Sequence, residues 1–252
     1  NLLGNSVAVP VVRAVAERPV AALTGGPPRV SEPAGGPFRS GARAGRQPQA
    51  TAPGADPTRK CRRNGGRMPP SPLAWYGAKG RLAPAIVKLF PPHRTYIEPF
   101  LGGGSVFFAK PPSPVEVVND MHGDLVNFFR VLRDGVQRDR LIDLVEGTPW
   151  SRGEFCDALA ARKAGRWQDD AERARLFLVA TRQARNGVGR RPSDWSYTVG
   201  KTTGRARSRT SMWMGLPERL AVAGLRLRAA QIECGSWEAV LDRYESENTL
   251  AY

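Results

Sequence analysis

The sequence predicts an α/β fold built on a parallel sheet, and two neighbouring segments carry this prediction. Residues Tyr96–Phe108 read Y-I-E-P-F-L-G-G-G-S-V-F-F, an apolar run that enters a turn of three glycines and continues with helical spacing. Residues Val115–Asp120 form a second, β-branched run that ends in an acid, after which helical spacing resumes. Strands that end at a glycine turn or an acid and lead into helices are typical of α/β sheets that bind a nucleotide.

The first strand of this unit is expected over Thr95–Phe100, with the turn at 102–104 and a helix from about Ser105 to Lys110. Glycines at such a turn let the backbone approach a small molecule where a Cβ atom would collide. Glu98, near the end of the strand, is an acid that could reach the polar groups of a cofactor.

A second glycine-containing loop precedes this strand. Residues Trp75–Gly80 read W-Y-G-A-K-G and lead into an apolar helical pattern that ends at Pro91 and Pro92. Lys79 in a loop that opens a helix suits a carboxylate or phosphate ligand, although a solvated lysine is the alternative. No G-K-[ST] follows the glycines, so a P-loop is excluded.

Asp120 follows the glycine turn at roughly the spacing of the acid that accepts hydrogen bonds from ribose hydroxyls in nucleotide-binding folds. The alternative for this residue is an ordinary helix N-cap. A dinucleotide site would need G-x-G-x-x-G, and with Gly102 and Gly104 as the first two glycines the third position is Phe107. This ring disfavours NAD and an oxidoreductase, and leaves another adenosine-bearing cofactor.

Helical patterns dominate from about Val136. Ser151 begins a sequence of capping-box form, and Asp169–Thr181 is amphipathic. Apolar periodicity is lost from Val188 to about Thr210, where Trp195 and Tyr197 are interleaved with cations: Arg190, Arg191, Lys201, Arg205, Arg207 and Arg209. Cations and aromatics on a loop or hairpin suit phosphate contact and groove entry, and a solvated loop is the alternative.

The α/β pattern then returns. We expect a strand over Leu227–Cys234, a short helix capped by Ser236, and the start of another strand at Thr249–Tyr252. The predicted regions are therefore a tail (1–70), two sheet-forming parts (71–135 and 225–252) and the helical region between them (136–224).

Composition points to a polyanionic partner. The 252-residue chain has 38 Lys and Arg against 23 Asp and Glu, a formal net charge of +15. Its three cysteines, Cys61, Cys156 and Cys234, are far apart without C-x-x-C pairing, which argues against a metal site or disulfide framework and fits a reducing cytosol. No apolar run approaches the ~20 residues of a membrane helix, so we expect a cytoplasmic protein.

Residues 1–70 are rich in proline, glycine and arginine, a composition that cannot bury enough apolar surface to fold. We expect a disordered basic tail. Its arginines could grip a phosphate backbone. The alternative, which we favour, is that translation naturally starts at Met68 and the preceding residues were never selected as protein.

The order of these features along the chain resembles that in the Dam-type DNA adenine-N6 methyltransferases. The resemblance extends from about Trp75 to Tyr252. W-Y-G-A-K resembles the family's W-x-G-G-K, with Ala78 in place of its second glycine. E-P-F-L-G-G-G-S-V-F-F is similar to its glycine motif, N-D-M-H-G-D-L to its ribose motif, and R-N-G, from Arg185, to an element of its DNA-recognition insert.

The resemblance implies a Rossmann-like sheet that binds S-adenosylmethionine (SAM), with an inserted, mainly helical DNA-recognition region at about 136–224. It implies cofactor contacts from two loops and the strand tip, with Lys79 near the SAM carboxylate, Glu98 to Gly104 along the methionine end and Asp120 on the ribose: Trp75, Lys79, Glu98, Pro99, Phe100, Gly102, Gly103, Gly104 and Asp120. The partner would be double-stranded DNA, bound by a monomer without a metal through Arg185, Asn186, Arg190, Arg191, Lys201, Arg205, Arg207 and Arg209.

One motif of the family is missing. Its catalytic Asp-Pro-Pro-Tyr follows a strand resembling T-L-A-Y, and by that alignment the chain ends one or two residues before it. In the family, the aspartate and proline carbonyl would orient the exocyclic amine of a flipped adenine, and the tyrosine would stack on the base. We therefore expect an inactive fragment with an incomplete sheet. The alternative is a basic DNA-binding protein that kept the fold and lost catalysis.

Overall fold

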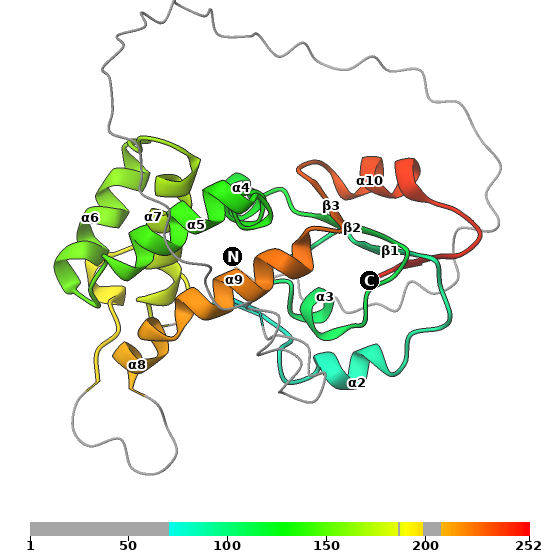
Figure 1. Cartoon of the computed structure of the whole chain (residues 1–252), viewed down its shortest axis with the longest axis horizontal. Coiled ribbons are helices and arrows are strands. Elements are labelled where there is room, and N and C mark those ends of the chain that lie inside the picture. Colours follow the sequence, from blue (N-terminus) through cyan, green and yellow to red (C-terminus); the bar gives the residue numbers. More distant parts are fainter. Residues whose placement is uncertain (1–70, 186, 199–207) are drawn as a thin grey trace, which may run out of the picture. The chain divides into compact units, whose positions relative to one another are not determined.

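The structure is a computed structural model that describes residues 71–185, 187–198 and 208–252. Its four parallel strands form one sheet in the order β3-β2-β1-β4. The strands are β1 (Thr95–Glu98), β2 (Val115–Asn119), β3 (Ala230–Glu233) and β4 (Thr249–Ala251). β1 pairs with β2 on one side and with β4 on the other (Figure 1). The parallel α/β sheet predicted from the sequence is confirmed, whereas the predicted tail at 1–70 lies outside the described residues.

Side chains of the sheet alternate between two buried faces. Ile97 and Val117 lie on one face, where they pack with Val240 of helix α10 (Trp237–Tyr244). Tyr96 and Val118 lie on the other, among the aromatic residues of α3 and α4. Helices on both faces explain why the central strands β1 and β2 are buried along almost their whole length.

The remaining helices follow the sequence signals closely. They are α2 (Ala83–Val87), α3 (Ser105–Ala109), α4 (Gly123–Arg133), α5 (Gly135–Glu146), α6 (Arg152–Lys163), α7 (Asp170–Arg182), α8 (Arg209–Met214) and α9 (Leu216–Leu227), with a 3-10 turn, η1, at Pro192–Asp194. Ser151 and Ser236 are confirmed as N-caps, and Asp169 caps α7. None of these helices, among the described residues, is long and apolar enough to cross a membrane.

Helix α9 continues further than the sequence suggested. The predicted strand at Leu227–Cys234 begins only at Ala230, because Leu227 completes the apolar stripe of α9 with Leu216, Leu220 and Ala223. All four side chains are buried. The predicted boundary at residue 224 therefore falls inside a helix.

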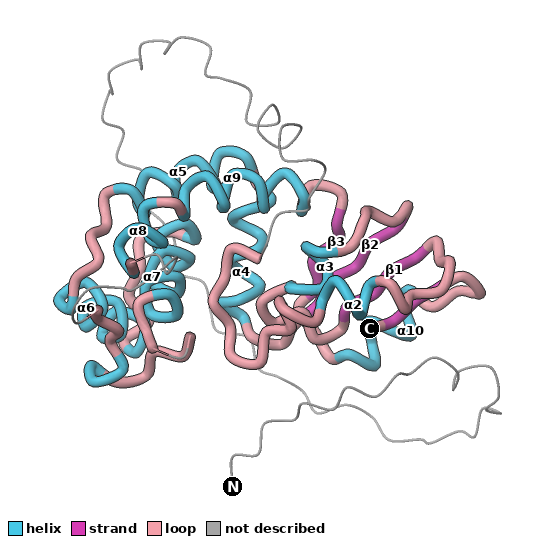
Figure 2. Tube along the Cα trace, turned by 90° about the horizontal axis from the view of Figure 1, so that it is seen from below, coloured by secondary structure: helices cyan, strands magenta, loops and turns pink. Residues whose placement is uncertain are grey.

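Helices α4, α5 and α7 pack against one another, α9 packs against α4 and α5, and α4 also contacts β3 (Figures 1 and 2). Their shared core includes Phe128, Leu141, Phe177 and Leu220. The helical segment between β2 and β3 is thus joined to the sheet through α4 and α9. Its predicted role as a DNA-recognition insert remains a prediction.

A buried cluster of charges ties α9 to the sheet. The side chain of Glu116 on β2 is 1% exposed. It accepts hydrogen bonds from the two terminal guanidinium nitrogens of Arg226, at 2.5 and 2.7 Å, and from the Nζ atom of Lys110 at 2.6 Å. Arg226 also donates to the carbonyl of Phe107 and stacks on its ring, 4.0 Å from the centroid. Burial alone would raise the pKa of Glu116, but the hydrogen bonds from Arg226 and Lys110 hold it below its ordinary value.

The variant Arg226→Met tests this cluster. It leaves the Glu116 carboxylate buried with one cation instead of two, so we expect a loss of about 3–5 kcal/mol in the free energy of unfolding. Arg243→Met removes an arginine from the exposed Arg243–Glu233 pair (3.1 Å) and should cost no more than about 1 kcal/mol. Urea unfolding measures both, and equal losses would contradict the role given to Arg226.

Candidate active site at the carboxyl edge of the sheet

The carboxyl ends of the strands meet at one edge of the sheet, called here the carboxyl edge. Strand order reverses at β1, since β2 continues the sheet in one direction and β4 in the other. Ligands of open parallel sheets bind at such a switch point. Asn119 joins three segments at this edge: its side chain donates to the carbonyls of Pro99 (2.9 Å) and Gly235 (3.0 Å) and accepts from the Gly235 N–H.

The glycine turn after β1 is shaped by a tryptophan. Gly102 and Gly104 have φ angles of +49° and +66°, which disfavour residues with a Cβ atom. A Cβ on Gly102 would lie 2.9 Å from the Trp75 ring, and one on Gly103 would lie 3.0 Å from the Trp75 Cβ. Contact with Trp75 is therefore a reason for small residues at 102 and 103 that the sequence did not reveal, and the approach of a ligand to this turn stays a prediction.

Asp120 bridges the turn and the next helix. Its Oδ2 atom accepts from the Gly102 N–H and its Oδ1 atom from the His122 N–H, both at 2.9 Å. The N-cap of α4 is His122, whose Nδ1 accepts from the Leu125 N–H at 3.3 Å. The helix N-cap reading of Asp120 is thus wrong, and the carboxylate instead lies directly beside the glycine turn.

The loop that carries Lys79 lies against the same turn. Ala78 is 3.8 Å from the position of a Cβ on Gly103, and the Lys79 carbonyl accepts from the N–H groups of Leu82 and Ala83 at 2.8 Å. Trp75 packs edge-on to the ring of His122, with the centroids 5.6 Å apart. Trp75, Gly102, Gly103 and Asp120 are therefore brought together as expected, with the Lys79 loop beside them.

Residues 71–75 form a strap between the carboxyl edge and the helical segment. Ser71 donates from Oγ to the Gly103 carbonyl. Its own carbonyl accepts from Arg219 of α9 at 2.6 Å, and the Pro72 carbonyl accepts from Arg182 of α7. Burial, with the nearby charge of Arg219, lowers the pKa of Arg182 to about 9.

The strap also meets the R-N-G element. A Cβ on Gly187, whose φ is +70°, would lie 2.7 Å from the carbonyl oxygen of Ala74. Sequence reasoning missed the strap and the roles of Arg182 and Arg219, because they depend on partners far away in the chain. It also missed His122 as the N-cap of α4, since histidine is not among the preferred capping residues. The strap joins the element that resembles a DNA-recognition motif to the one that resembles a cofactor motif.

Glu98 is enclosed rather than open to a ligand. Glu98 is 3% exposed, and its Oε2 atom accepts a hydrogen bond from the Tyr96 hydroxyl at 2.8 Å. Burial raises the pKa of Glu98 to about 8, so the side chain is mostly protonated at neutral pH. Pro99 is buried as well, whereas Phe100 is 68% exposed and lies near Trp237.

Four of the predicted DNA-contacting residues are described: Arg185, Arg190, Arg191 and Arg209. Asn186, Lys201, Arg205 and Arg207 lie outside the described residues. The Asp194 carboxylate accepts from the N–H groups of Arg190 and Arg191 (3.0 and 2.9 Å) and so shapes the loop. Arg185 and Arg209 both line a hollow of about 130 Å³ beside Trp213.

Aromatic rings and arginines stack beside this loop. Trp195 and Tyr197 are stacked with centroids 5.8 Å apart and an interplanar angle of 24°. Arg152 lies 5.0 Å from the Trp195 ring and Arg185 lies 5.5 Å from the Tyr197 ring. Arg152 was not predicted, since its position in the first turn of α6 gives no sign that it contacts the loop.

No group of three or more His, Cys, Asp or Glu side chains in the described part of the chain is arranged to hold a metal ion. The site instead offers a carboxylate, a glycine turn and an aromatic ring at the switch point of a parallel sheet. These features are typical of one class, the α/β proteins whose parallel sheet has a ligand site at its carboxyl edge.

Within that class, residues 75–252 match the family model described as "D12 class N6 adenine-specific DNA methyltransferase". The match covers more than half of the chain, which therefore belongs to this family, and the resemblance seen in the motifs is confirmed.

Two relatives are similar to parts of the chain. "DNA N-6-adenine-methyltransferase" of Escherichia phage P1 is 30% identical over 67% of this chain and 21% of its own length. "Type II methyltransferase M1.LlaDCHI" of Lactococcus lactis subsp. cremoris is 31% identical over 50% of this chain and 45% of its own length. The chain thus spans less than half the length of either relative.

Protonation of Glu98 predicts a pH dependence of stability. Between its ordinary pKa of 4.5 and the native value of about 8, the folded chain keeps a proton that the unfolded chain loses. Stability from this group is therefore full at low pH and is lost as the pH rises toward about 8. Glu98→Gln, which keeps an acceptor for Tyr96, should flatten the decline between about pH 5 and 8.

Thermal unfolding across this range measures the effect. The exposed Glu146→Gln serves as the control and should follow the wild-type profile. A Glu98→Gln profile identical to that of the wild type would show that Glu98 is ionised in the folded chain.

Proposed function

We propose that this chain carries the SAM-binding and DNA-recognition parts of a site-specific DNA adenine-N6 methyltransferase. The observation that carries the proposal is the hydrogen bond of 2.9 Å between Asp120 and the Gly102 N–H at the switch point of the sheet. It brings the glycine turn and a strand-tip carboxylate into one site beside Trp75, which is the combination that an adenosine-type cofactor requires. Membership of the family supports the choice of SAM.

The donor set suits SAM on chemical grounds. Asp120 offers carboxylate oxygens to the ribose hydroxyls, and Lys79 offers a cation to the carboxylate of the methionine part. Trp75 and the backbone of 102–104 would line the ligand, with Pro99 and Phe100 beside the methionine end. When bound, SAM supplies an electrophilic methyl group.

Two features argue against a dinucleotide. Helix α3 has only five residues, from Ser105 to Ala109, and Phe107 at the position of the third glycine is fully buried beneath Arg226. A pyrophosphate site needs a longer helix that approaches the sheet through a glycine. An NAD-linked reaction is therefore not proposed.

The helical segment 136–224 is proposed to bind double-stranded DNA. The stack of Arg152, Trp195, Tyr197 and Arg185 presents cations and aromatic faces, and Tyr197 is 50% exposed. Arginines bind phosphates and exposed rings stack on bases or sugars. The strap would connect DNA contact in this segment to Trp75 in the cofactor site.

SAM binding tests the role of Asp120. We expect isothermal titration to detect SAM binding by the wild-type chain, and Asp120→Asn to weaken it about 10- to 100-fold through loss of charge-assisted hydrogen bonds. Asp157→Asn, an exposed aspartate on α6, is the matched control and should bind like the wild type. Binding of NAD in place of SAM, or equal affinity of the two variants, would contradict the assignment.

Methyl transfer is a separate expectation. The printed sequence contains no Asp-Pro-Pro-Tyr, the element that would orient the adenine amine toward the methyl group. We therefore expect this polypeptide to bind SAM and DNA without transferring tritiated methyl groups to an adenine-containing duplex above the protein-free blank. Incorporation above that blank would show that other residues orient the amine.

A further inference from the structure

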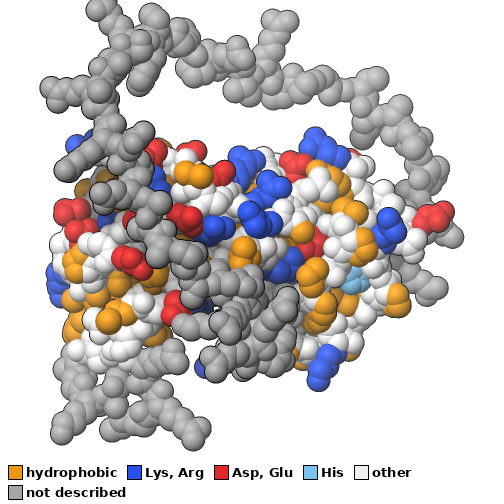
Figure 3. All heavy atoms as spheres, in the orientation of Figure 1, with side chains coloured by type: hydrophobic (Ala, Val, Ile, Leu, Met, Phe, Trp, Pro, Cys, Tyr) orange, Lys and Arg blue, Asp and Glu red, His pale blue; other side chains and the backbone are white. Residues whose placement is uncertain are grey.

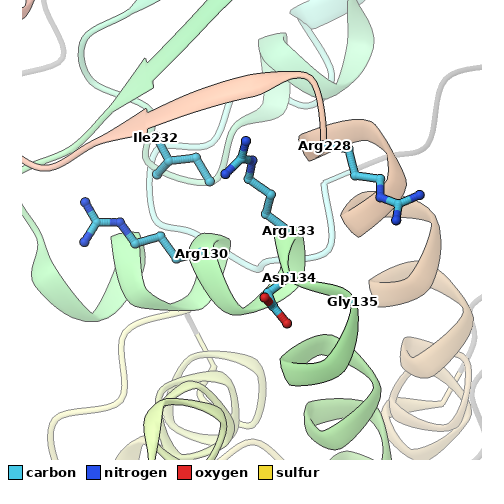
Figure 4. Close-up of a pocket in the computed structure, with 6 residues that line it drawn as sticks. All are labelled: Arg130, Arg133, Asp134, Gly135, Arg228 and Ile232. Atoms are coloured by element: carbon cyan, nitrogen blue, oxygen red, sulfur yellow. The ribbon is translucent and has the colours of Figure 1, made fainter.

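A basic hollow lies at the edge strand β3, between the ends of α4 and α9. It has a volume of about 550 Å³ and is lined by residues from the ends of two helices, the start of a third and one strand (Figure 4): Arg130, Arg133, Asp134, Gly135, Arg228 and Ile232. Lysine and arginine side chains gather over α4 and the neighbouring end of α9 (Figure 3). Three guanidinium groups against one carboxylate make the hollow cationic.

The three arginines are available to a ligand. Arg130, Arg133 and Arg228 are exposed, and none of their guanidinium groups forms a hydrogen bond or ion pair with another residue that the structure describes. In Figure 4, Arg133 extends from α4 toward Ile232 of β3, with Arg130 and Arg228 on either side of it.

The two acids near the hollow already accept hydrogen bonds from other groups. Asp134 caps α5 through a hydrogen bond of 2.9 Å from the Gln137 N–H to its Oδ1 atom. Glu233, at the end of β3, accepts from the Tyr244 hydroxyl at 2.7 Å and from Arg243 at 3.1 Å. The positive charge of the three guanidinium groups is therefore only partly offset.

The hollow is distinct from the carboxyl edge. Helix α4 begins three residues after Asp120 and carries the chain back along the sheet for 11 residues, roughly 16 Å at about 1.5 Å per residue. Arg133 is its last residue, and Arg228 stands just before β3 begins. Both side chains thus belong to the amino ends of the strands, where they would not compete with SAM.

We propose that this hollow binds the phosphate backbone of DNA, as a second contact outside the target site. The inference rests on the proposed function, which supplies DNA as the partner. A guanidinium group can donate two parallel hydrogen bonds to the oxygens of one phosphate, and it stays charged at neutral pH. A surface of mixed charge would not select a polyanion. Such contacts increase the affinity for DNA without recognising its sequence, so the affinity should fall steeply as the salt concentration rises.

The test compares two double variants that each remove two positive charges. Arg133→Gln/Arg228→Gln changes the hollow, and Lys88→Gln/Arg94→Gln changes exposed residues elsewhere. Fluorescence anisotropy with a short DNA duplex gives the affinity at several concentrations between about 50 and 200 mM salt. Every other cation of the chain contributes equally to both variants.

We expect the hollow variant to bind the duplex more weakly and to lower the slope of log K against log salt by about 2, at about 0.9 per lost contact. The control should keep nearly the wild-type slope, and SAM titration should be unchanged in both. Arg130→Gln alone is a second variant, with an expected decrease of about 1 in the slope. Circular dichroism verifies that each variant is folded.

Equal slopes for the two double variants would overturn the proposal while leaving the proposed function intact. Loss of inorganic phosphate binding, followed by phosphorus NMR, with unchanged duplex binding would also overturn it, since the site would then serve a free anion. If the wild-type chain binds no duplex at all, the proposed function and this inference both fail.

Discussion

The structure depends on the burial of one carboxylate, that of Glu116. A charge taken out of water destabilises the fold unless opposite charges and hydrogen bonds meet it. Here Arg226 of α9 and Lys110 at the end of α3 do so from different elements of the chain. Neutralising this charge therefore fixes α9 against the sheet and α3 beneath the glycine turn at once, and the geometry of the candidate site follows from both placements.

At the carboxyl edge, rigid elements hold the candidate site. Asp120 joins the turn to α4, Asn119 joins three segments after the strands, and Trp75 covers the glycines. The strap then links this edge to α7 and α9 through Arg182 and Arg219. The segment proposed to contact DNA and the segment proposed to contact the cofactor are thus joined by direct hydrogen bonds.

The sequence predicted the elements whose signals are local. β-branched runs, capping residues and a glycine turn each depend on neighbours within a few positions, so β1, β2 and the cap at Ser151 could be recognised. What could not be predicted depends on distant partners. Arg226 and Glu116 are 110 positions apart, and so are Arg182 and Pro72, while Glu98 turned inward because Tyr96 and the sheet enclose it.

The most direct test of the account is a crystal structure of the chain with S-adenosylhomocysteine, the demethylated product of SAM. Density for its adenosine is expected at the carboxyl edge, with the ribose hydroxyls at Asp120 and the methionine part along 99–104. Density in the hollow of Arg130, Arg133 and Arg228, or on a face that Asp120 does not reach, would contradict the central claim that the switch point of this sheet is the cofactor site.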